Sequence, residues 1–371
     1  MKVCGLIAEF NPFHNGHQIY LRKAKELTGA DFYILALSPN FVQRGEPAII
    51  SKEERAKIAI ENGVDLVIEI PTIYTLENAD IYAFAALSML EDIGCDDVVF
   101  GTESGDSETF IKKFKNKDFG SPRMDEIVSR YLKEGYSYPK AKALAMEEIN
   151  DFYLENPNDI LAYSYLKIID KYNLKIKPLC YQRLRGEDDE FSSAIKIRNC
   201  LKDKRDTHPD LHYLDDYFDY LQYKLQTSTP SELRNIHLVD EGIENLFIKK
   251  INKVNSMDEF IAACTSKRYS GARIKRTICH ILLNTDKGEA KRVLEHKPSY
   301  IRVLASNAKG RKYLASIRKG NESNIILRFA AKDNPNLLFE LKASNLYYLT
   351  KKSTERLEYQ QKELKDFPIK L

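Results

Sequence analysis

Short apolar runs alternate with segments whose apolar residues recur at helical spacing along the first half of the chain. Buried strands are expected at Val3–Ala8, Phe32–Leu37, Leu66–Ile70, Asp97–Phe100 and Ile176–Tyr181. Helical spacing lies between them at Gln18–Leu27, from a capping box at Ser51 and Glu54 to about Glu61, and at Asn78–Ile93. This alternation predicts βαβ units, a parallel sheet and an α/β fold.

The pattern changes twice further along the chain. Residues from about 107 to 172 have helical spacing, including an amphipathic helix at Ile160–Ile169 that Asn158 or Asp159 can cap. Beyond residue 203 no strand–helix alternation is evident. We therefore expect one domain over residues 1–202 with a helical insertion at about 107–172, and a mainly helical region over 203–371. The tail from Lys351 is strongly charged, which predicts a solvated helix or an extension.

Composition limits the class of protein. With 371 residues, 43% apolar and 11% aromatic, the chain is long enough for two or three domains with ample cores. Because the net charge is only +3, any basic surface must be a local patch. The six cysteines are scattered without a C-x-x-C pair, as in buried thiols of a cytosolic protein. No leader segment and no long apolar run is evident, so we expect a cytoplasmic protein with no membrane partner.

The strongest chemical signal follows the first strand. His14-Asn15-Gly16-His17 leads directly into the first helical segment. A helix N-terminus attracts anions through free N–H groups, and two imidazoles three residues apart share one helix face. Gly16 lets a phosphate approach the backbone. This pattern predicts a site for a nucleoside triphosphate attacked at its α-phosphorus; the alternative is a pair of capping or surface histidines.

Other loops leave the carboxyl ends of the expected strands, where ligands of parallel sheets bind. One carries Gln43 and Arg44, and another carries Gly101 and Glu103. After the fifth strand, Ser192 and Ser193 open a helix that contains Lys196 and Arg198. These serines could cap the helix or bind phosphate.

A basic segment lies in the second half of the chain, at residues 265–276. It combines a tyrosine with five cations: Lys267, Arg268, Arg273, Lys275 and Arg276. Such a segment is suited to binding phosphate-rich RNA. Basic helix surfaces are also common in proteins that do not bind nucleic acid.

Several ordered segments together carry a family resemblance. They are GLIAEFNPFHNGH, SPNFVQRGEPAIISKEERAKIAIENGVDLVIEIP, FGTESGD, PNDIL, FSSAIKIR and TSKRYSGARIKR. The chain resembles the tRNA(Met) cytidine acetate ligases of the H-x-G-H superfamily, which also holds nucleotidyltransferases and class I aminoacyl-tRNA synthetases. The resemblance implies a Rossmann-like nucleotidyltransferase domain followed by a helical tRNA-binding region. The sequence departs from the family at Pro39, where glycine is usual, and near Asp188, where a tyrosine–histidine pair is usual.

The resemblance also implies an activity and a site. Acetate and ATP would form acetyl-adenylate, and the acetyl group would pass to N4 of the wobble cytidine of elongator tRNA(Met). No tightly bound cofactor or metal-ligand set is expected, although Mg²⁺ commonly accompanies ATP. We expect His14, His17 and Arg198 to stabilise phosphate charge. The expected ATP-binding residues, with the two serines included, are Ile7, Ala8, Glu9, Phe10, Asn11, Pro12, Phe13, His14, Asn15, Gly16, His17, Gln18, Ile19, Tyr20, Gly101, Asn158, Arg183, Ser192 and Ser193.

Two other functions fit the same sequence features. A cofactor-forming adenylyltransferase would join AMP to a phosphorylated small molecule through the same N-terminal motif. A non-catalytic RNA-binding protein would keep only a vestigial nucleotide fold. The long helical region with its basic segment favours a large polyanionic acceptor, and the intact histidines favour retained chemistry.

Overall fold

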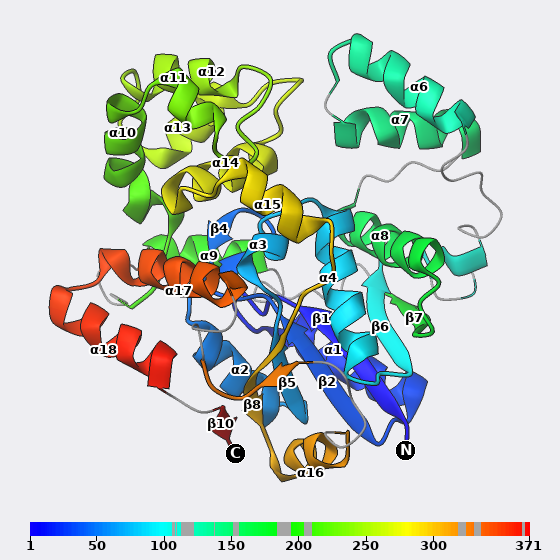
Figure 1. The fold of residues 1–371 in the computed structure, drawn as a ribbon. Coiled ribbons are helices and arrows are strands. Elements are labelled where there is room, and N and C mark those ends of the chain that lie inside the picture. The colour runs from blue at the N-terminus through cyan, green and yellow to red at the C-terminus, as the bar shows by residue number, and fades with distance from the viewer. Residues whose placement is uncertain are drawn as a thin grey trace.

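A computed structural model describes most of the chain. The described residues are 1–105, 108, 110–112, 122–136, 138–150, 156–183, 194–203, 210–317, 324–329, 335–365 and 368–371. Their main feature is a sheet whose strand order is β10-β8-β5-β2-β1-β6-β7, with β9 paired to β8 (Figure 1). The strands are β1 (Val3–Ala8), β2 (Phe32–Leu37), β5 (Leu66–Glu69), β6 (Asp97–Thr102), β7 (Lys177–Gln182), β8 (Ile301–Ser306), β9 (Ile325–Ile326) and β10 (Ile369–Lys370).

The five strands expected from the sequence are all present and mutually parallel, which confirms the α/β fold. Their order reverses at β1, because β2 and β5 lie on one side of it and β6 and β7 on the other. In a parallel sheet such a reversal opens a crevice at the carboxyl ends of the two strands that flank it. The sheet therefore places its ligand-binding edge between β1 and β6.

Helices cover both faces of the parallel strands, which explains why the central strands β1 and β2 are apolar along their whole length. On one face, Ile34 and Ala36 pack with α4 (Ala79–Asp92) and α8 (Pro157–Tyr172). On the other face, Leu35 and Leu37 pack with α1 (Asn15–Thr28) and α2 (Lys52–Glu61). A short helix, α3 (Thr72–Thr75), follows β5.

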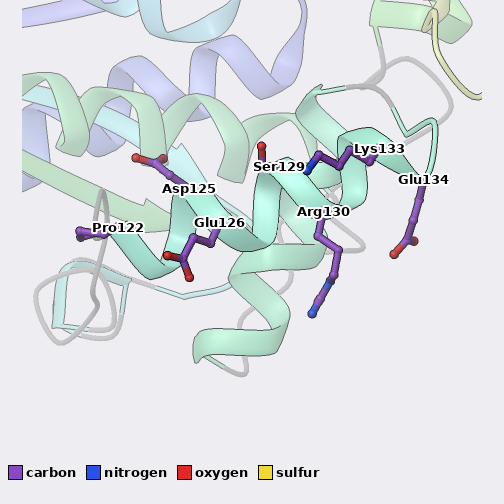
Figure 2. A pocket seen from close by; sticks show the side chains of 7 residues that line it. All are labelled: Pro122, Asp125, Glu126, Ser129, Arg130, Lys133 and Glu134. Carbon is purple, nitrogen blue, oxygen red and sulfur yellow. The ribbon is translucent and has the colours of Figure 1, made fainter.

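The insertion forms a helical hairpin of α6 (Pro122–Lys133) and α7 (Tyr138–Asn150) that stands beyond α8, away from the sheet (Figure 1). Met124, Ile127 and Val128 of α6 are buried together with apolar residues of α7. The outer side of α6 forms an open depression that carries both signs of charge (Figure 2). It is lined by Pro122, Asp125, Glu126, Ser129, Arg130, Lys133 and Glu134. This mixture is typical of a solvated helix face.

The second half of the chain builds its own helical core. Tyr217, Leu221, Phe247, Phe260 and Ile278 are fully buried at its centre. The helices and turns of this region and the segment before it are α9 (Ala194–Asp203), η2 (Leu214–Tyr217), α10 (Phe218–Thr227), α11 (Pro230–Arg234), α12 (Ile243–Ile251), α13 (Met257–Cys264), α14 (Gly271–Leu283) and α15 (Lys287–Leu294). In the described part of the chain, no helix is both long and apolar enough to span a bilayer.

The chain then returns to the sheet, which the sequence interpretation missed. Strand β8 pairs antiparallel with β5, and all six of its residues are buried. Its charged Arg302 interrupts the apolar run that would have indicated a strand. The elements that follow β8 are α16 (Ala308–Ile317), α17 (Pro335–Tyr347), η4 (Tyr348–Thr350) and α18 (Ser353–Lys365).

The expectation of a solvated helix in the tail is confirmed for most of α18, whose residues are exposed or half-buried, but Glu363 of this helix lies in a buried ion network. Lys52 Nζ lies 2.6 Å from Glu69 Oε1 and 2.8 Å from Glu363 Oε1. Arg302 Nη1 lies 3.1 Å from Glu69 Oε2 and 2.5 Å from Glu363 Oε1. Two cations are thus balanced by two carboxylates, and β10 adds a strand beside β8.

Glu363→Gln should lower the free energy of unfolding by about 3 kcal/mol at pH 7, because it leaves two buried cations to share the single carboxylate of Glu69. Burial alone would raise the pKa of Glu363, but Lys52 and Arg302 overcome this effect and hold the pKa at about 2. A carboxyl with a lowered pKa stabilises the fold above its ordinary pKa of 4.5, and this contribution is lost as the pH falls towards 2. Urea unfolding between pH 7 and pH 3 measures both effects.

Glu358→Gln is the matched control on the same helix. The Glu358 side chain is 66% exposed and pairs with Lys362 one turn further along α18. Its replacement should change the free energy of unfolding by less than about 0.5 kcal/mol. Equal losses in the two variants would contradict a stabilising role for the buried network.

Candidate nucleotide site

The turn from β1 into α1 is fixed by two histidines. His14 has extended backbone and caps the helix, and its Nδ1 accepts the N–H of Gly16 at 3.0 Å. The Nδ1 of His17 accepts the N–H of His14 at 3.3 Å. The helix capping that the sequence analysis gave as an alternative role for these histidines is therefore present. It also has a chemical consequence, since an accepting Nδ1 places the proton of each neutral ring on Nε2.

The ring of His17 sits in an aromatic setting. Its centroid lies 4.7 Å from that of Phe10, 5.6 Å from that of Phe13 and 3.9 Å from that of His14. Burial lowers the pKa of His17 well below 6.5, and the charges of His14 and Arg183 lower it further. His17 is thus a neutral N–H donor at physiological pH.

Tyr20 of α1 keeps the crevice open between β1 and β6. The two strands pair only from Cys4 opposite Asp97 to Leu6 opposite Val99. Beyond this point, the Tyr20 hydroxyl accepts the N–H of Ile7 at 3.2 Å and donates to the carbonyl of Val99 at 2.7 Å. The hydroxyl therefore satisfies both strands where they separate, and the two histidines follow at the same edge.

The far wall of the crevice comes from β6, β7 and α8. At Gly101, an added Cβ would lie 3.0 Å from the Cδ and Cγ of Arg183, so a side chain there would force the arginine stem to shift. The Arg183 N–H donates to the carbonyl of Thr102 at 2.7 Å. Asn158 Nδ2 donates to Glu103 Oε1 at 2.7 Å. The structure thus gathers Gly101, Asn158 and Arg183 at the ends of neighbouring strands.

The near wall combines a half-buried carboxylate, Glu9, with arginines. Glu9 Oε1 accepts the N–H of Gln43 at 3.0 Å. Burial raises the pKa of Glu9, and the charges of Arg44 and Arg198 partly oppose this effect. Arg198 Nη1 donates to the carbonyl of Asn11 at 2.8 Å, which joins α9 to the motif. Ser192 and Ser193 lie outside the described residues, so their predicted contacts stay predictions.

Sequence reasoning missed Arg55, a fully buried arginine on α2. Its Nη1 donates to the carbonyls of Glu9 at 2.6 Å and Ser38 at 2.9 Å, and its Nε donates to that of Ile50 at 3.2 Å. Its Nη2 also contacts the carbonyl of Pro39. Arg55 therefore ties together the loops after β1 and β2. The sequence signal that could have indicated its burial was its position next to the apolar residues Ala56, Ala59 and Ile60 of the same helix.

The basic segment does not form one uniform patch. Lys267 lies over the Tyr136 ring at 3.7 Å, and Arg268 and Arg273 lie 3.5 and 3.2 Å from a carboxylate oxygen of Glu241. The last two cations turn towards the loop after β2: Lys275 pairs with Glu46, and Arg276 donates to the carbonyl of Gln43. The segment is thus divided between two surroundings.

One cluster among the described residues has the composition of a metal site. Glu77, His237 and His280 bring their possible ligand atoms within 4.8 Å of one another. However, His237 Nε2 contacts Glu77 Oε1, and the His280 nitrogens hydrogen bond with Thr285 Oγ1 at 3.0 Å and the carbonyl of Leu76 at 3.2 Å. These polar groups satisfy one another and join the loop after α3 to α14.

Comparison with known proteins identifies the class. The sequence model of the HIGH Nucleotidyl Transferase family matches residues 1–362. This match covers the crevice and the helical region, so the chain belongs to that family of nucleotidyltransferases.

Relatives within the class are more specific. Two proteins named tRNA(Met) cytidine acetate ligase, from Clostridium perfringens SM101 and Bacillus subtilis 168, are 39% and 33% identical to the chain. The alignments cover 94% of this chain and 95% of the first relative, and 100% and 97% for the second. The chain belongs to this ligase family, which confirms the resemblance.

Solved structures agree with this family assignment. The apo structure of Thermotoga maritima TmcAL matches with a TM-score of 0.89 and 29% identity, covering 100% of both chains. A second structure of that protein, bound with alpha-thio ATP, matches with the same score, identity and coverage. The fold is therefore shared along the whole chain.

The ring resonances of His17 should not shift between pH 8 and pH 6.5, because its lowered pKa keeps the ring neutral over this range. NMR spectra of labelled histidine rings measure this directly, and His17→Gln assigns the resonance by its disappearance. A titration with its midpoint near pH 6.5 would contradict the assignment of a buried neutral donor.

Proposed function

We propose that this protein activates acetate with ATP and acetylates N4 of the wobble cytidine of elongator tRNA(Met). The observation that carries the proposal is the pair of histidines whose Nδ1 atoms cap the helix at the crevice between β1 and β6, which leaves the two Nε2 atoms to face a ligand. Support also comes from full-length relatives whose names state this activity. Such a substrate would place the protein in the cytoplasm.

ATP would bind along the crevice. The N-terminus of α1 offers free N–H groups and the positive end of its dipole to the phosphates. His14 and His17 would donate through Nε2, and Arg198 would add positive charge from α9. The segment Ile7–Tyr20 would surround the nucleotide, and Gly101, Asn158, Arg183, Ser192 and Ser193 would complete the site. The alpha-thio ATP of Thermotoga maritima TmcAL supports nucleotide binding by this fold.

The reaction would proceed in two displacements. An acetate oxygen attacks the α-phosphorus, a P–O bond forms, and pyrophosphate leaves. Negative charge grows on the phosphate oxygens, and donors placed in advance stabilise it without reorganisation. The cytidine N4 then attacks the acetyl carbonyl; a C–N bond forms, the acyl C–O bond to the AMP phosphate breaks, and AMP and one N4 proton leave. Both steps require positioning and charge stabilisation, and neither needs a covalent enzyme intermediate.

Mg²⁺ would neutralise part of the triphosphate charge, as it does in many ATP sites. The carboxylates placed at the crevice are already engaged: Glu9 accepts the Gln43 N–H, and Glu103 accepts from Asn158. In the described part of the site these groups do not form a carboxylate cage. The ion would therefore arrive with the triphosphate, and the chain's own donors would still contact the α-phosphate.

The decisive experiment supplies ATP, acetate and an elongator tRNA(Met) transcript, and measures N4-acetylcytidine by mass spectrometry. Its appearance at the wobble position supports the proposal. ATP–pyrophosphate exchange driven by a phosphorylated metabolite but not by acetate would favour a cofactor-forming adenylyltransferase. Failure to bind ATP would favour a non-catalytic RNA-binding protein.

His17→Ala should lower the rate of acetate-dependent ATP–pyrophosphate exchange by about a hundredfold or more, because it removes a donor to the reacting phosphate. Binding of tRNA should change little, since His17 lies in the crevice and not on the basic segment. His296→Ala, at an exposed histidine after α15, is the control and should keep the parental rate. An unchanged exchange rate in His17→Ala would refute the site.

Lys267→Ala combined with Arg268→Ala should weaken tRNA binding, because both side chains are exposed cations in the connection between α13 and α14. The slope of log affinity against log salt should fall by about one for each phosphate that the variant no longer neutralises. Filter binding at several salt concentrations measures this slope. Lys57→Ala, at an exposed lysine on α2, is the control. An unaltered slope would exclude these two cations from the tRNA surface.

A further inference from the structure

A small hairpin lies between the candidate nucleotide site and the basic segment. It consists of β3 (Phe41–Val42) and β4 (Glu46–Pro47), which pair antiparallel, and Figure 1 shows it beneath α14. Its turn, Gln43-Arg44-Gly45, contains the polar residues that the sequence places after the second strand. The residues proposed above to bind ATP do not include this turn, so its role is still to be explained.

One side of the hairpin is held by α14. Lys275 pairs with Glu46, and Arg276 Nη1 donates to the carbonyl of Gln43 at 3.4 Å. Cys279 Sγ donates to the carbonyl of Gly45 at 3.3 Å. Gly45 has φ +79°, and an added Cβ there would lie 2.4 Å from the backbone N of Arg276. Hairpin and helix therefore meet backbone to backbone, which fixes their relative position.

The opposite side of the hairpin contacts the crevice. The backbone N–H of Gln43 donates to Glu9 Oε1, and the N–H of Ile49, just beyond β4, donates to Asn11 Oδ1 at 2.8 Å. Arg44 is exposed at the tip, yet its charge acts on both Glu9 and Arg198. A cation at this place stands at the rim of the site where a polyphosphate would lie.

Lys275 and Arg276 differ from the cations that precede them. The side chain of Lys275 is 28% exposed and that of its partner Glu46 is 20% exposed, whereas the side chain of Arg268 is 58% exposed. A cation that is committed to an inward ion pair must give up that pair before it can contact RNA. The basic segment thus contains two kinds of cation: Lys275 makes an internal contact, and Arg268 lies on the exposed surface.

We propose that Lys275 and Arg276 are positioning residues of the nucleotide site, and that the hairpin they hold presents Arg44 to the phosphates of ATP. This inference rests on the proposed function for the identity of the nucleotide. It departs from the sequence expectation that Lys275 and Arg276 bind tRNA. It also adds Arg44 to the groups that contact the triphosphate.

Charge reversal tests the proposal without tRNA in the assay. Lys275→Glu and Glu46→Lys, made singly, should each weaken ATP binding by about tenfold, since like charges would then face each other at this contact and displace the tip of the hairpin. The double variant restores an ion pair of opposite polarity and should recover ATP affinity to within about threefold. Arg44→Gln should lose affinity to the same extent as the single variants. Calorimetry measures ATP affinity, and thermal unfolding confirms that each variant is folded.

Kinetics separate a positioning role from general damage. In acetate-dependent ATP–pyrophosphate exchange, the single variants should raise the KM for ATP with little change in kcat, and Lys275→Arg should keep the parental KM. Lys249→Glu, at an exposed lysine on α12, is the control for added negative charge and should match the parent. If Lys275→Glu does not fold, Lys275→Met replaces it in both assays.

The proposal is overturned if Lys275→Glu loses tRNA binding but keeps the parental ATP affinity, because Lys275 would then be an RNA ligand. It is also overturned if the double variant stays as weak as the single ones. A parental protein that binds ATP but shows no acetate-dependent exchange would refute the proposed function alone. The calorimetric comparison would still decide the role of the hairpin.

Discussion

The structure depends on the separation of β1 and β6 at their carboxyl ends. Wherever neighbouring parallel strands part, backbone N–H and carbonyl groups lose their partners, and leaving them buried without replacement is costly. The phenol of Tyr20 supplies that replacement, with one bond to each strand. Because Tyr20 belongs to α1, the same helix that keeps the crevice open also presents its N-terminus to it. One side chain thus links the sheet, the helix and the site.

The two histidines show how local folding and chemistry are joined. Their Nδ1 atoms cap the helix, so the fold itself selects the tautomer with a proton on Nε2. Burial then keeps His17 neutral. A neutral donor costs less to bury than a cation, and it can still stabilise charge that develops on a phosphate. Capping and anion binding are therefore compatible roles of the same residues.

Sequence reasoning predicted what depends on local pattern and missed what depends on distant partners. The central parallel strands were found because burial on both faces makes them continuous apolar runs, as in Phe32–Leu37. Strand β8 was missed because Arg302 is tolerated only beside Glu69 and Glu363, residues far away in the chain. The motif His14–His17 was predicted from its position between strand and helix. Arg55 was not, because the carbonyls it binds are brought together only by the fold.

The buried ion network has a consequence for how the chain folds. Lys52 and Glu363 are 311 positions apart, yet they meet beneath the same sheet. During synthesis Lys52 and its near partner Glu69 emerge long before Glu363, so the network is completed only when the far segment arrives. Contacts of such large sequence separation slow folding, because the loop must close before the contact forms. Completion of the buried charge balance at β5 therefore depends on the last helix of the chain.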